Sequence, residues 1–470
     1  MTEGVTLPLW LVVLVGLLAL AGLLDRLLVP SVRWLIRSRA NKVLDEVAQH
    51  LKIEIRPFQQ TRRQVLIDRL LYDSKVQQAA ADYARAQNMP REVVMGRIGA
   101  YAREIVPAFN AYFYFRIGYW LGRKIAQSLF RVRVGYTDTA GLARISPEAT
   151  VVFVMNHRSN MDYILAAYLV ADQAALSYAV GEWARIWPLQ QLIRSMGAYF
   201  VRRNSKDELY RRVLERYIGM ATEAGVTQAL YPEGSLSRDG RLREPKLGAL
   251  DYMLRGFNPE GERDLVFIPL GINYDRTLED RTLLLGLDRE AKRPGTLKAA
   301  WNTIAFATHQ AGLRLRSDWH RFGYACVNFG TPLSMREHLQ AGGFDWRKLD
   351  REARQARVAE LRQELMQRVG KLVPVLPVPL VALVFVRNPG KALSELELKS
   401  EVETLIEQLE ASGAHIYIPR RDRDYAITAG LRMMLLRHMV TETDGLYAAD
   451  PAEARLLAYY ANSIAHLPPQ

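Results

Sequence analysis

The longest apolar stretch of the chain lies close to its beginning. Residues 7–24 form an unbroken run of 18 uncharged and mostly apolar side chains. As an α-helix this run would be about 27 Å long, close to the hydrocarbon thickness of a bilayer. Before it the only charged side chain is Glu3, whereas five basic residues follow within residues 26–42. This asymmetry predicts a single-pass membrane anchor with the rest of the chain in the cytoplasm, and a buried N-terminal helix is the alternative.

Residues 43–147 are expected to be mostly helical. Apolar side chains recur at helical spacing within residues 44–51 and 64–87. Residues 109–130 differ because they combine many aromatic rings with three basic side chains. This mixture fits a helix lying in the lipid interface, and it fits equally a core helix whose rings pack on a sheet.

Apolar runs and helical patterns alternate from residue 149 to about residue 333. Alternation of this kind predicts a mostly parallel sheet wrapped by helices. In such sheets ligands bind beyond the carboxyl ends of the strands. The clearest expected helix is 206–223, and the expected strands are 151–155, 199–202, 228–231, 265–272 and 324–329.

A Pro-rich stretch at residues 373–379 marks a boundary after the charged, helical residues 334–372. Beyond it a small α/β region is expected, with strands at 380–386 and 415–418, a helix at 393–412 and two final helices. The chain is therefore expected to be an α/β protein that also carries an N-terminal transmembrane helix. Its expected parts are a membrane anchor with a basic juxtamembrane segment (1–42), a helical region (43–147), a sheet domain (148–372) and a C-terminal α/β region (373–470).

Charge and cysteine content narrow the possible functions. The formal net charge of the 470-residue chain is +13, which suits a polyanionic partner such as anionic lipid, nucleic acid or a phosphorylated substrate. Because no nucleic-acid-binding motif accompanies the charge, the lipid and substrate interpretations are favoured. The single cysteine, Cys326, excludes an internal disulfide and a multi-thiolate metal site. No two histidines stand at metal-ligand spacing, so no metal site is predicted.

The candidate chemistry begins at His157 and Asp162, which flank a strand-to-helix junction. Five positions apart, they can share the first helical turn, where the carboxylate fixes the tautomer and leaves the other ring nitrogen as a base. Transfer of an acyl group to an alcohol needs such a base, because the hydroxyl loses its proton as it attacks. Taken alone, a His near an Asp is more often a surface hydrogen bond.

Three further blocks follow the His157–Asp162 pair in order. They are Gly-Ala-Tyr-Phe-Val-Arg-Arg at 197–203, Tyr-Pro-Glu-Gly-Ser-Leu-Ser-Arg at 231–238 and Ile-Pro-Leu at 268–270. The ordered set resembles the four motif blocks of the glycerolipid acyltransferases, especially the bacterial-type glycerol-3-phosphate acyltransferases and their dihydroxyacetone-phosphate relatives. The resemblance extends over most of the chain from about residue 60. It implies that residues 148–372 are an acyltransferase domain.

The resemblance also implies roles for individual residues. His157 is expected to be the general base and Asp162 its orienting partner, and no covalent intermediate is expected. Adjacent arginines on a strand point to opposite faces, so only one of Arg202 and Arg203 should reach the substrate while the other pairs with an acidic residue. The family pattern favours Arg203. The expected substrate-binding residues are Arg202, Arg203, Glu233, Gly234, Ser235, Ser237, Arg238, Lys246 and Pro269.

One position departs from the family pattern. The related enzymes carry Arg two residues after the glycine of the third block, whereas this chain has Leu236. Either Arg238 alone supplies the charge for the acceptor phosphate, or the acceptor is not glycerol 3-phosphate.

The resemblance implies an enzyme of the inner (cytoplasmic) membrane that acylates the sn-1 hydroxyl of glycerol 3-phosphate in the first step of phospholipid synthesis. Acyl-CoA or acyl-acyl carrier protein would be the co-substrate, a bilayer with anionic lipids would be the surroundings, and no cofactor is expected. One alternative is acylation of lysophosphatidic acid or another lysolipid. Another is a non-catalytic basic protein of the membrane surface.

Overall fold

The computed structural model of the protein describes residues 56–111, 113–170, 176–181, 189–202, 205–246, 248–286, 322–344 and 348–467. The anchor expected at 7–24 and the helix expected at 44–51 lie outside these residues. Within the part of the chain that the structure describes, no helix has both the length and the apolar character needed to cross a membrane.

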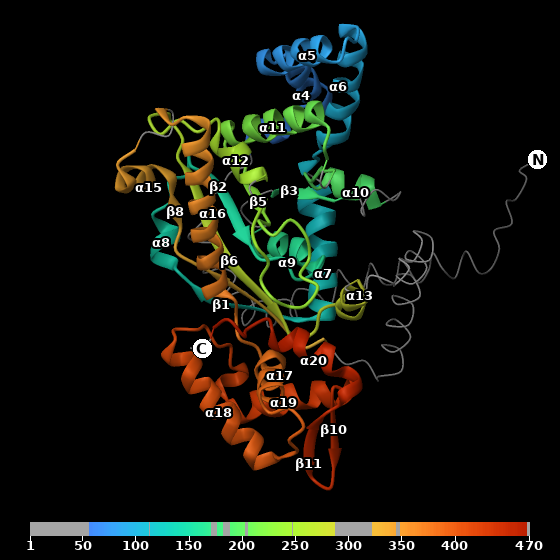
Figure 1. Ribbon diagram of the computed structural model, residues 1–470, viewed down its shortest axis with the longest axis vertical. Helices are drawn as coiled ribbons and strands as arrows, with labels where there is room; N and C mark the ends of the chain where they lie inside the picture. The colour runs from blue at the N-terminus through green and yellow to red at the C-terminus, as the bar shows by residue number, and fades with distance from the viewer. Residues whose placement is uncertain are drawn as a thin grey trace, which may run out of the picture. The chain divides into compact units, whose positions relative to one another are not determined.

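Helices precede the sheet and surround it (Figure 1). Those before residue 150 are α3 (Pro57–Gln60), α4 (Arg63–Leu71), α5 (Ser74–Ala86), α6 (Arg91–Ile105), the π-helix η1 (Phe113–Gly118), α7 (Tyr119–Leu129) and α8 (Thr139–Ala143). Those between and after the strands are α9 (Met161–Val170), α10 (Leu189–Ser195), α11 (Glu208–Glu223), α12 (Gly248–Leu254), α13 (Asp280–Leu285), α15 (Met335–Gly342) and α16 (Arg351–Leu372).

Among the described residues, the central sheet has eight strands, and all five expected strands belong to it. Its strands are β1 (Arg131–Thr137), β2 (Thr150–Met155), β3 (Ser177–Val180), β4 (Tyr199–Phe200), β5 (Gln228–Leu230), β6 (Leu265–Tyr274), β7 (Tyr324–Phe329) and β8 (Leu333–Ser334). The order is β1-β7-β6-β2-β5-β3-β4, with β8 beside β6. All neighbouring pairs are parallel except β6 with β7 and β6 with β8. The mostly parallel α/β sheet is confirmed.

Helices cover the sheet because its central strands are apolar on both faces. Every residue of β2 and β6 is buried. On one face Val152 and Val154 join a hydrophobic cluster with residues of α4–α6, α11, α12 and α16. Alternate residues of β2, such as Phe153, point to the other face and are also buried. A strand buried on both faces reads as a continuous apolar run, which is why β2 and β6 could be predicted.

The N-terminal helical region differs from the expectation in two places. The single stretch expected at 64–87 is two helices, because the carboxylate of Asp73 caps α5 by accepting the backbone N–H of Lys75 at 3.0 Å. The aromatic stretch at 109–130 packs partly inward: Tyr114 is 1% exposed, whereas Trp120 on α7 is 54% exposed. The interpretation as a core helix therefore fits Tyr114 but not Trp120.

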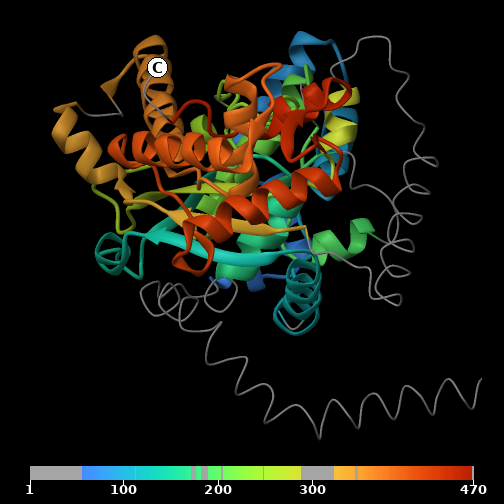
Figure 2. The same ribbon diagram turned by 90° about the horizontal axis from the view of Figure 1, so that it is seen from below.

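The C-terminal region has its own hydrophobic cluster, which spans Val375 to Ile464. Its elements are α17 (Pro377–Arg387), β9 (Leu393–Ser394), α18 (Glu395–Ala411), η4 (Pro419–Arg421), α19 (Arg423–Leu436), β10 (Val440–Thr443), β11 (Leu446–Ala449), η5 (Pro451–Glu453) and α20 (Ala454–Ala461). Seen from below, its orange and red helices lie in front of the strands of the sheet (Figure 2).

Two strands expected in this region were wrong. Residues 380–386 belong to α17, whose apolar side chains are buried all around, so the run carries no helical periodicity. Pro377 opens this helix, where a missing N–H costs nothing. Residues 415–418 make only an isolated bridge between Ile416 and Val375. The helix expected at 393–412 is confirmed as α18, which begins with a capping box at Ser394.

Candidate active site

The first block lies at the carboxyl end of β2, beside β6. The side chain of Asn156 continues the strand pairing, because it accepts from the backbone N–H of Ile272 and donates to its carbonyl, both at 2.8 Å. The next residue, His157, is 1% exposed. Its N–H donates to the carboxylate of Glu233 at 2.8 Å, and its carbonyl accepts from the N–H of Ser237 at 3.0 Å. Two residues of the third block thus hold the backbone of His157.

The structure brings His157 and Asp162 together. Nδ1 of His157 lies 2.9 Å from Oδ2 of Asp162, and both side chains are buried. Oδ2 also accepts the backbone N–H groups of Arg158 at 2.7 Å and Ser159 at 3.1 Å. Tyr274 donates its hydroxyl to Oδ1 at 2.7 Å. Surrounded by donors, Asp162 acts as an acceptor, so Nδ1 carries a proton and Nε2 is left as the base.

Aromatic rings enclose the imidazole. The ring centroid of Tyr231 lies 4.3 Å from that of His157, and Tyr163 meets the imidazole edge-on at 5.3 Å. The hydroxyl of Tyr163 lies 3.3 Å from Nε2. Burial and the charge of Asp162 hold the pKa of Tyr231 well above its ordinary value. An enclosed site of this kind strengthens the attraction between the carboxylate and an imidazolium.

Glu233 of the third block connects the block to the loop that follows it. One carboxylate oxygen accepts the N–H of His157, and the other accepts the N–H of Arg243 at 2.9 Å. The side chain is 1% exposed, and burial raises the pKa of Glu233 to about 7. Among the described residues, the hydrogen-bond donors to this carboxylate are backbone N–H groups. Glu233 therefore fixes the backbone around His157.

Gly234 and Lys246 lie together. Gly234 has a φ of +68°, a conformation that glycine adopts at little cost. A Cβ at this position would lie 3.1 Å from Cδ of Lys246, so the lysine side chain passes directly over the glycine. The backbone N–H of Lys246 donates to the carbonyl of Pro232 at 2.7 Å. The structure therefore places an exposed cation beside the third block.

A second cation, which the sequence analysis missed, lies on the same loop. The guanidinium of Arg243 donates to Oγ of Ser235 and, at 3.3 Å, to the carbonyl of Leu236. Arg243 is exposed. It thereby approaches Leu236, the residue at which the sequence departs from the pattern of the third block.

The other two residues of the third block have different surroundings. Ser237 is buried and donates its hydroxyl to the carbonyl of Arg241 at 2.7 Å, a bond that fixes the loop. Arg238 is exposed and donates to the carbonyl of Gly286 at 2.9 Å, just beyond α13. Arg238 is thus close to the surface, and Ser237 is internal.

The second and fourth blocks contribute less directly. Arg202 forms a bidentate pair with Glu104, at 2.9 Å and 2.6 Å, and its guanidinium lies over the ring of Tyr101. Arg203, the residue favoured for substrate contact, lies outside the described residues. Pro269 lies within β6 opposite Val154, and its carbonyl accepts a backbone N–H from the loop after β7. Arg202 and Pro269 thus both contact other residues of the protein.

Glu279 supports the first block from the other side. Its carboxylate accepts the hydroxyl of Ser159 at 2.7 Å and both the N–H (3.1 Å) and the side-chain amide (3.0 Å) of Asn160. Burial raises the pKa of Glu279. Tyr274 and Glu279 both lie more than 100 positions after the first block. No local spacing connects them to it, so the sequence alone gave no sign of either role.

The C-terminal region meets the first block through Arg158. This side chain is buried, donates to the carbonyl of Gly240 at 2.6 Å and lies with its guanidinium 5.1 Å from the ring centre of Tyr459 on α20. Gly240 has a φ of +87°, and a Cβ there would lie 1.9 Å from the carbonyl oxygen of Tyr459. The loop after the third block therefore depends on glycine to pack against α20.

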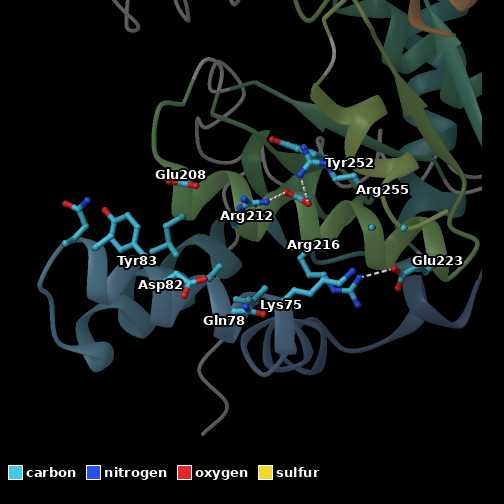
Figure 3. Close-up of a pocket in the computed structure, with 18 residues that line it drawn as sticks. Lys75, Gln78, Asp82, Tyr83, Glu208, Arg212, Arg216, Glu223, Tyr252 and Arg255 are labelled. Carbon is cyan, nitrogen blue, oxygen red and sulfur yellow. Dashed lines mark hydrogen bonds and ion pairs between the residues drawn. The ribbon is translucent and has the colours of Figure 1, made fainter. Parts of the chain in front are cut away.

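A groove of about 470 Å³ between α5, α11 and α12 contains none of the block residues. Figure 3 shows its charged side chains, several of which pair within the groove. Arg216 pairs with Glu223 at 2.9 Å, and Arg212 and Arg255 both pair with Glu215. This groove therefore offers none of the acid–base chemistry found around His157.

The site at the carboxyl end of β2 can perform general base and general acid chemistry. A neutral imidazole with one protonated nitrogen can take a proton from a hydroxyl and return it to a leaving group. The adjacent carboxylate stabilises the imidazolium that forms between these steps. Nearby exposed cations, Arg243 and Lys246, suit an anionic acceptor.

Two family models match the chain. Residues 137–273 match the acyltransferase model, a range that contains all four blocks, including His157 and Asp162. Residues 313–468 match the model described as the glycerol-3-phosphate acyltransferase C-terminal region. Together they extend from the sheet to α20.

Curated relatives are similar in sequence to most of this chain. A glycerol-3-phosphate acyltransferase from Pseudomonas putida is 28% identical over 425 residues, which is 87% of this chain and 49% of the relative. One from Pseudomonas fluorescens is 27% identical over 445 residues, 91% of this chain and 51% of the relative. The chain thus spans about half the length of these relatives. The solved 1-acyl-sn-glycerophosphate acyltransferase PlsC of Thermotoga maritima aligns with a TM-score of 0.32 and 17% identity, over 55% of this chain and 80% of that one.

Proposed function

We propose that this protein is a glycerol-3-phosphate acyltransferase, which transfers a fatty acyl group from an acyl thioester to the sn-1 hydroxyl of glycerol 3-phosphate. The reaction would be the first step of phospholipid synthesis. The observation that carries the proposal is the buried dyad, in which Nδ1 of His157 lies 2.9 Å from the carboxylate of Asp162. Curated relatives that bear the name of this activity support the choice of acceptor.

The proposed reaction follows from the protonation states at the dyad. Nε2 of His157 takes the proton of the acceptor hydroxyl as its oxygen attacks the thioester carbonyl. The C–S bond then breaks, and the imidazolium gives the proton to the departing thiolate. Asp162 holds Nδ1–H throughout and stabilises the imidazolium, while Tyr274 and two backbone N–H groups hold Asp162.

The acceptor phosphate is proposed to bind beside the third block. Lys246 passes over Gly234, and Arg243 reaches the carbonyl of Leu236, so two exposed cations are available there. The guanidinium of Arg243 can bind a phosphate with two parallel N–H donors, which the side chain of Leu236 cannot do. Arg238 and Arg203 remain further candidates for the same phosphate. Arg202 is committed to Glu104 and is proposed to support the strand end.

The remaining parts of the proposal concern the donor and the membrane. Acyl-CoA and acyl-acyl carrier protein are both anionic thioesters, and the net charge of +13 suits either, as it suits anionic lipid. We propose that residues 7–24 anchor the protein in the inner (cytoplasmic) membrane, with the acyltransferase domain on the cytoplasmic side. The supporting observation is the excess of basic residues after this apolar run.

A second candidate acceptor is lysophosphatidic acid or another lysolipid. The observation in its favour is Leu236, an uncharged and partly exposed side chain where the family pattern has arginine. A lysolipid brings an apolar chain that such a surface can contact, in addition to its phosphate.

Thiol release from palmitoyl-coenzyme A separates these candidates. Purified full-length protein is supplied with glycerol 3-phosphate or with lysophosphatidic acid, and the acylated product is identified by mass spectrometry. Release that depends on glycerol 3-phosphate supports the proposal. Release only with the lysolipid transfers support to the second candidate. If both acceptors fail with coenzyme A and with acyl carrier protein as the carrier, the proposed function is wrong.

A further inference from the structure

The nitrogen that should act as the base is already occupied by a hydroxyl of the protein. Among the described residues, the hydrogen-bond partner of Nε2 of His157 is the Tyr163 hydroxyl, 3.3 Å away. Because Nδ1 is protonated toward Asp162, Nε2 has one lone pair and accepts one hydrogen bond. An acceptor hydroxyl therefore has to compete with Tyr163 for the same lone pair.

Ring contacts hold Tyr163 in this position. Its ring stacks on Tyr178 of β3, with centroids 5.0 Å apart and planes inclined by 28°. It meets Tyr231 at 4.8 Å and 62°, and it meets the imidazole at 5.3 Å and 79°. Tyr163 is only 9% exposed. Three rings from three segments of the chain thus fix the direction of its hydroxyl.

An acyltransferase that uses a His–Asp base has to avoid a wasteful reaction. The base activates any O–H group that reaches Nε2, and water is always available. Water that donates its proton to Nε2 would attack the thioester carbonyl, the C–S bond would break, and the imidazolium would protonate the thiolate. The products would be a free fatty acid and the thiol. Exclusion of water from an active site is a general way to prevent such hydrolysis.

We propose that Tyr163 is a positioning residue that occupies the Nε2 lone pair of His157 until an alcohol displaces it. This inference rests on the proposed acyl-transfer function. A separation of 3.3 Å is long for an O–H···N hydrogen bond, so the bond is weak and an acceptor that is anchored elsewhere by its phosphate can replace it. A water molecule has no such anchor. The hydroxyl of Tyr163 therefore favours transfer to the alcohol over transfer to water.

The substitution Tyr163→Phe tests this role while it retains the ring contacts. We expect thiol release from palmitoyl-coenzyme A without any acceptor to rise roughly three- to tenfold, the range that one neutral hydrogen bond controls. We also expect the KM for glycerol 3-phosphate to fall, because the acceptor no longer competes with Tyr163. A merely structural role would raise this KM. Tyr178→Phe is the matched control, since it removes a hydroxyl from the same ring stack but not the one at Nε2.

The outcomes distinguish this inference from the proposed function. Hydrolysis needs only the thioester, water and the base, so the acceptor-free assay decides the role of Tyr163 whichever alcohol is the natural acceptor. Faster hydrolysis in Tyr163→Phe but not in Tyr178→Phe supports the role. Equal hydrolysis in wild type and Tyr163→Phe, or an equal rise in both variants, would overturn it. A wild-type protein that transfers no acyl group to glycerol 3-phosphate would instead count against the proposed function.

Discussion

Glu233 should make the stability of the protein depend on pH. Its carboxylate is 1% exposed, and burial raises its pKa from 4.5 to about 7 in the folded protein. The folded state therefore keeps a proton that the unfolded chain releases between these two values. Stability from this group is fully present below about pH 4.5 and is lost as the pH rises through about 7. The rise in pKa corresponds to roughly 3 kcal/mol over the whole range.

Urea unfolding at about pH 5.5 and about pH 8 measures most of this effect. Over that interval the Glu233 contribution to the free energy of unfolding should fall by about 2 kcal/mol. Other groups titrate in the same interval, so wild type is compared with Glu233→Gln, whose side chain does not ionise. The stability advantage of wild type over Glu233→Gln should shrink by about 2 kcal/mol between the two pH values.

The exposed neighbour Glu244 provides the matched control. It lies on the same loop and accepts a hydrogen bond from Gln363 at 3.1 Å. Because this carboxylate is exposed, Glu244→Gln makes the same chemical change on the same loop without removing a buried carboxyl. A difference between wild type and Glu233→Gln that does not change with pH would refute the claim that burial raises the pKa of Glu233.

Three further substitutions test the support of the dyad and of its loop. Asp162→Asn can keep most of the hydrogen bonds but loses the negative charge beside the imidazolium. The lost attraction between the two charges is about 4 kcal/mol, so kcat for thiol release should fall about 10³-fold. Tyr274→Phe removes the donor to Oδ1 of Asp162, and kcat should fall roughly tenfold with an unchanged circular dichroism spectrum. Gly240→Ala forces a Cβ to 1.9 Å from the carbonyl of Tyr459 at a φ of +87°, so the Tm should fall by several degrees; an unchanged Tm would contradict the contact.

The sequence was most informative where local pattern and tertiary role coincide. The strands β2 and β6 are buried on both faces, so their apolar runs stand out. Asp162 lies in the first turn of α9 and His157 four residues before that helix, so their short spacing alone predicts contact. Leucine and valine runs are ambiguous in short segments, which is why the buried helix α17 was taken for a strand.

Residues that act from a distance could not be found in this way. Tyr274 and Glu279 reach the first block only because β6 lies beside β2. Arg243 faces Leu236 because the loop after the third block folds back on itself, a path that no residue pattern records. Tyr163 follows Asp162 directly, yet its role depends on where its hydroxyl points, which only the structure shows.

The central claim is that His157 is the base that drives acyl transfer to glycerol 3-phosphate. The most direct test is the rate of lysophosphatidic acid formation from palmitoyl-coenzyme A by wild type, His157→Ala and the control His338→Ala, whose histidine lies on α15 outside the four blocks. Loss of the base should lower kcat by about 10²–10⁴-fold in His157→Ala and leave His338→Ala near the wild-type rate. Product formation by a folded His157→Ala protein at the wild-type rate would contradict the account.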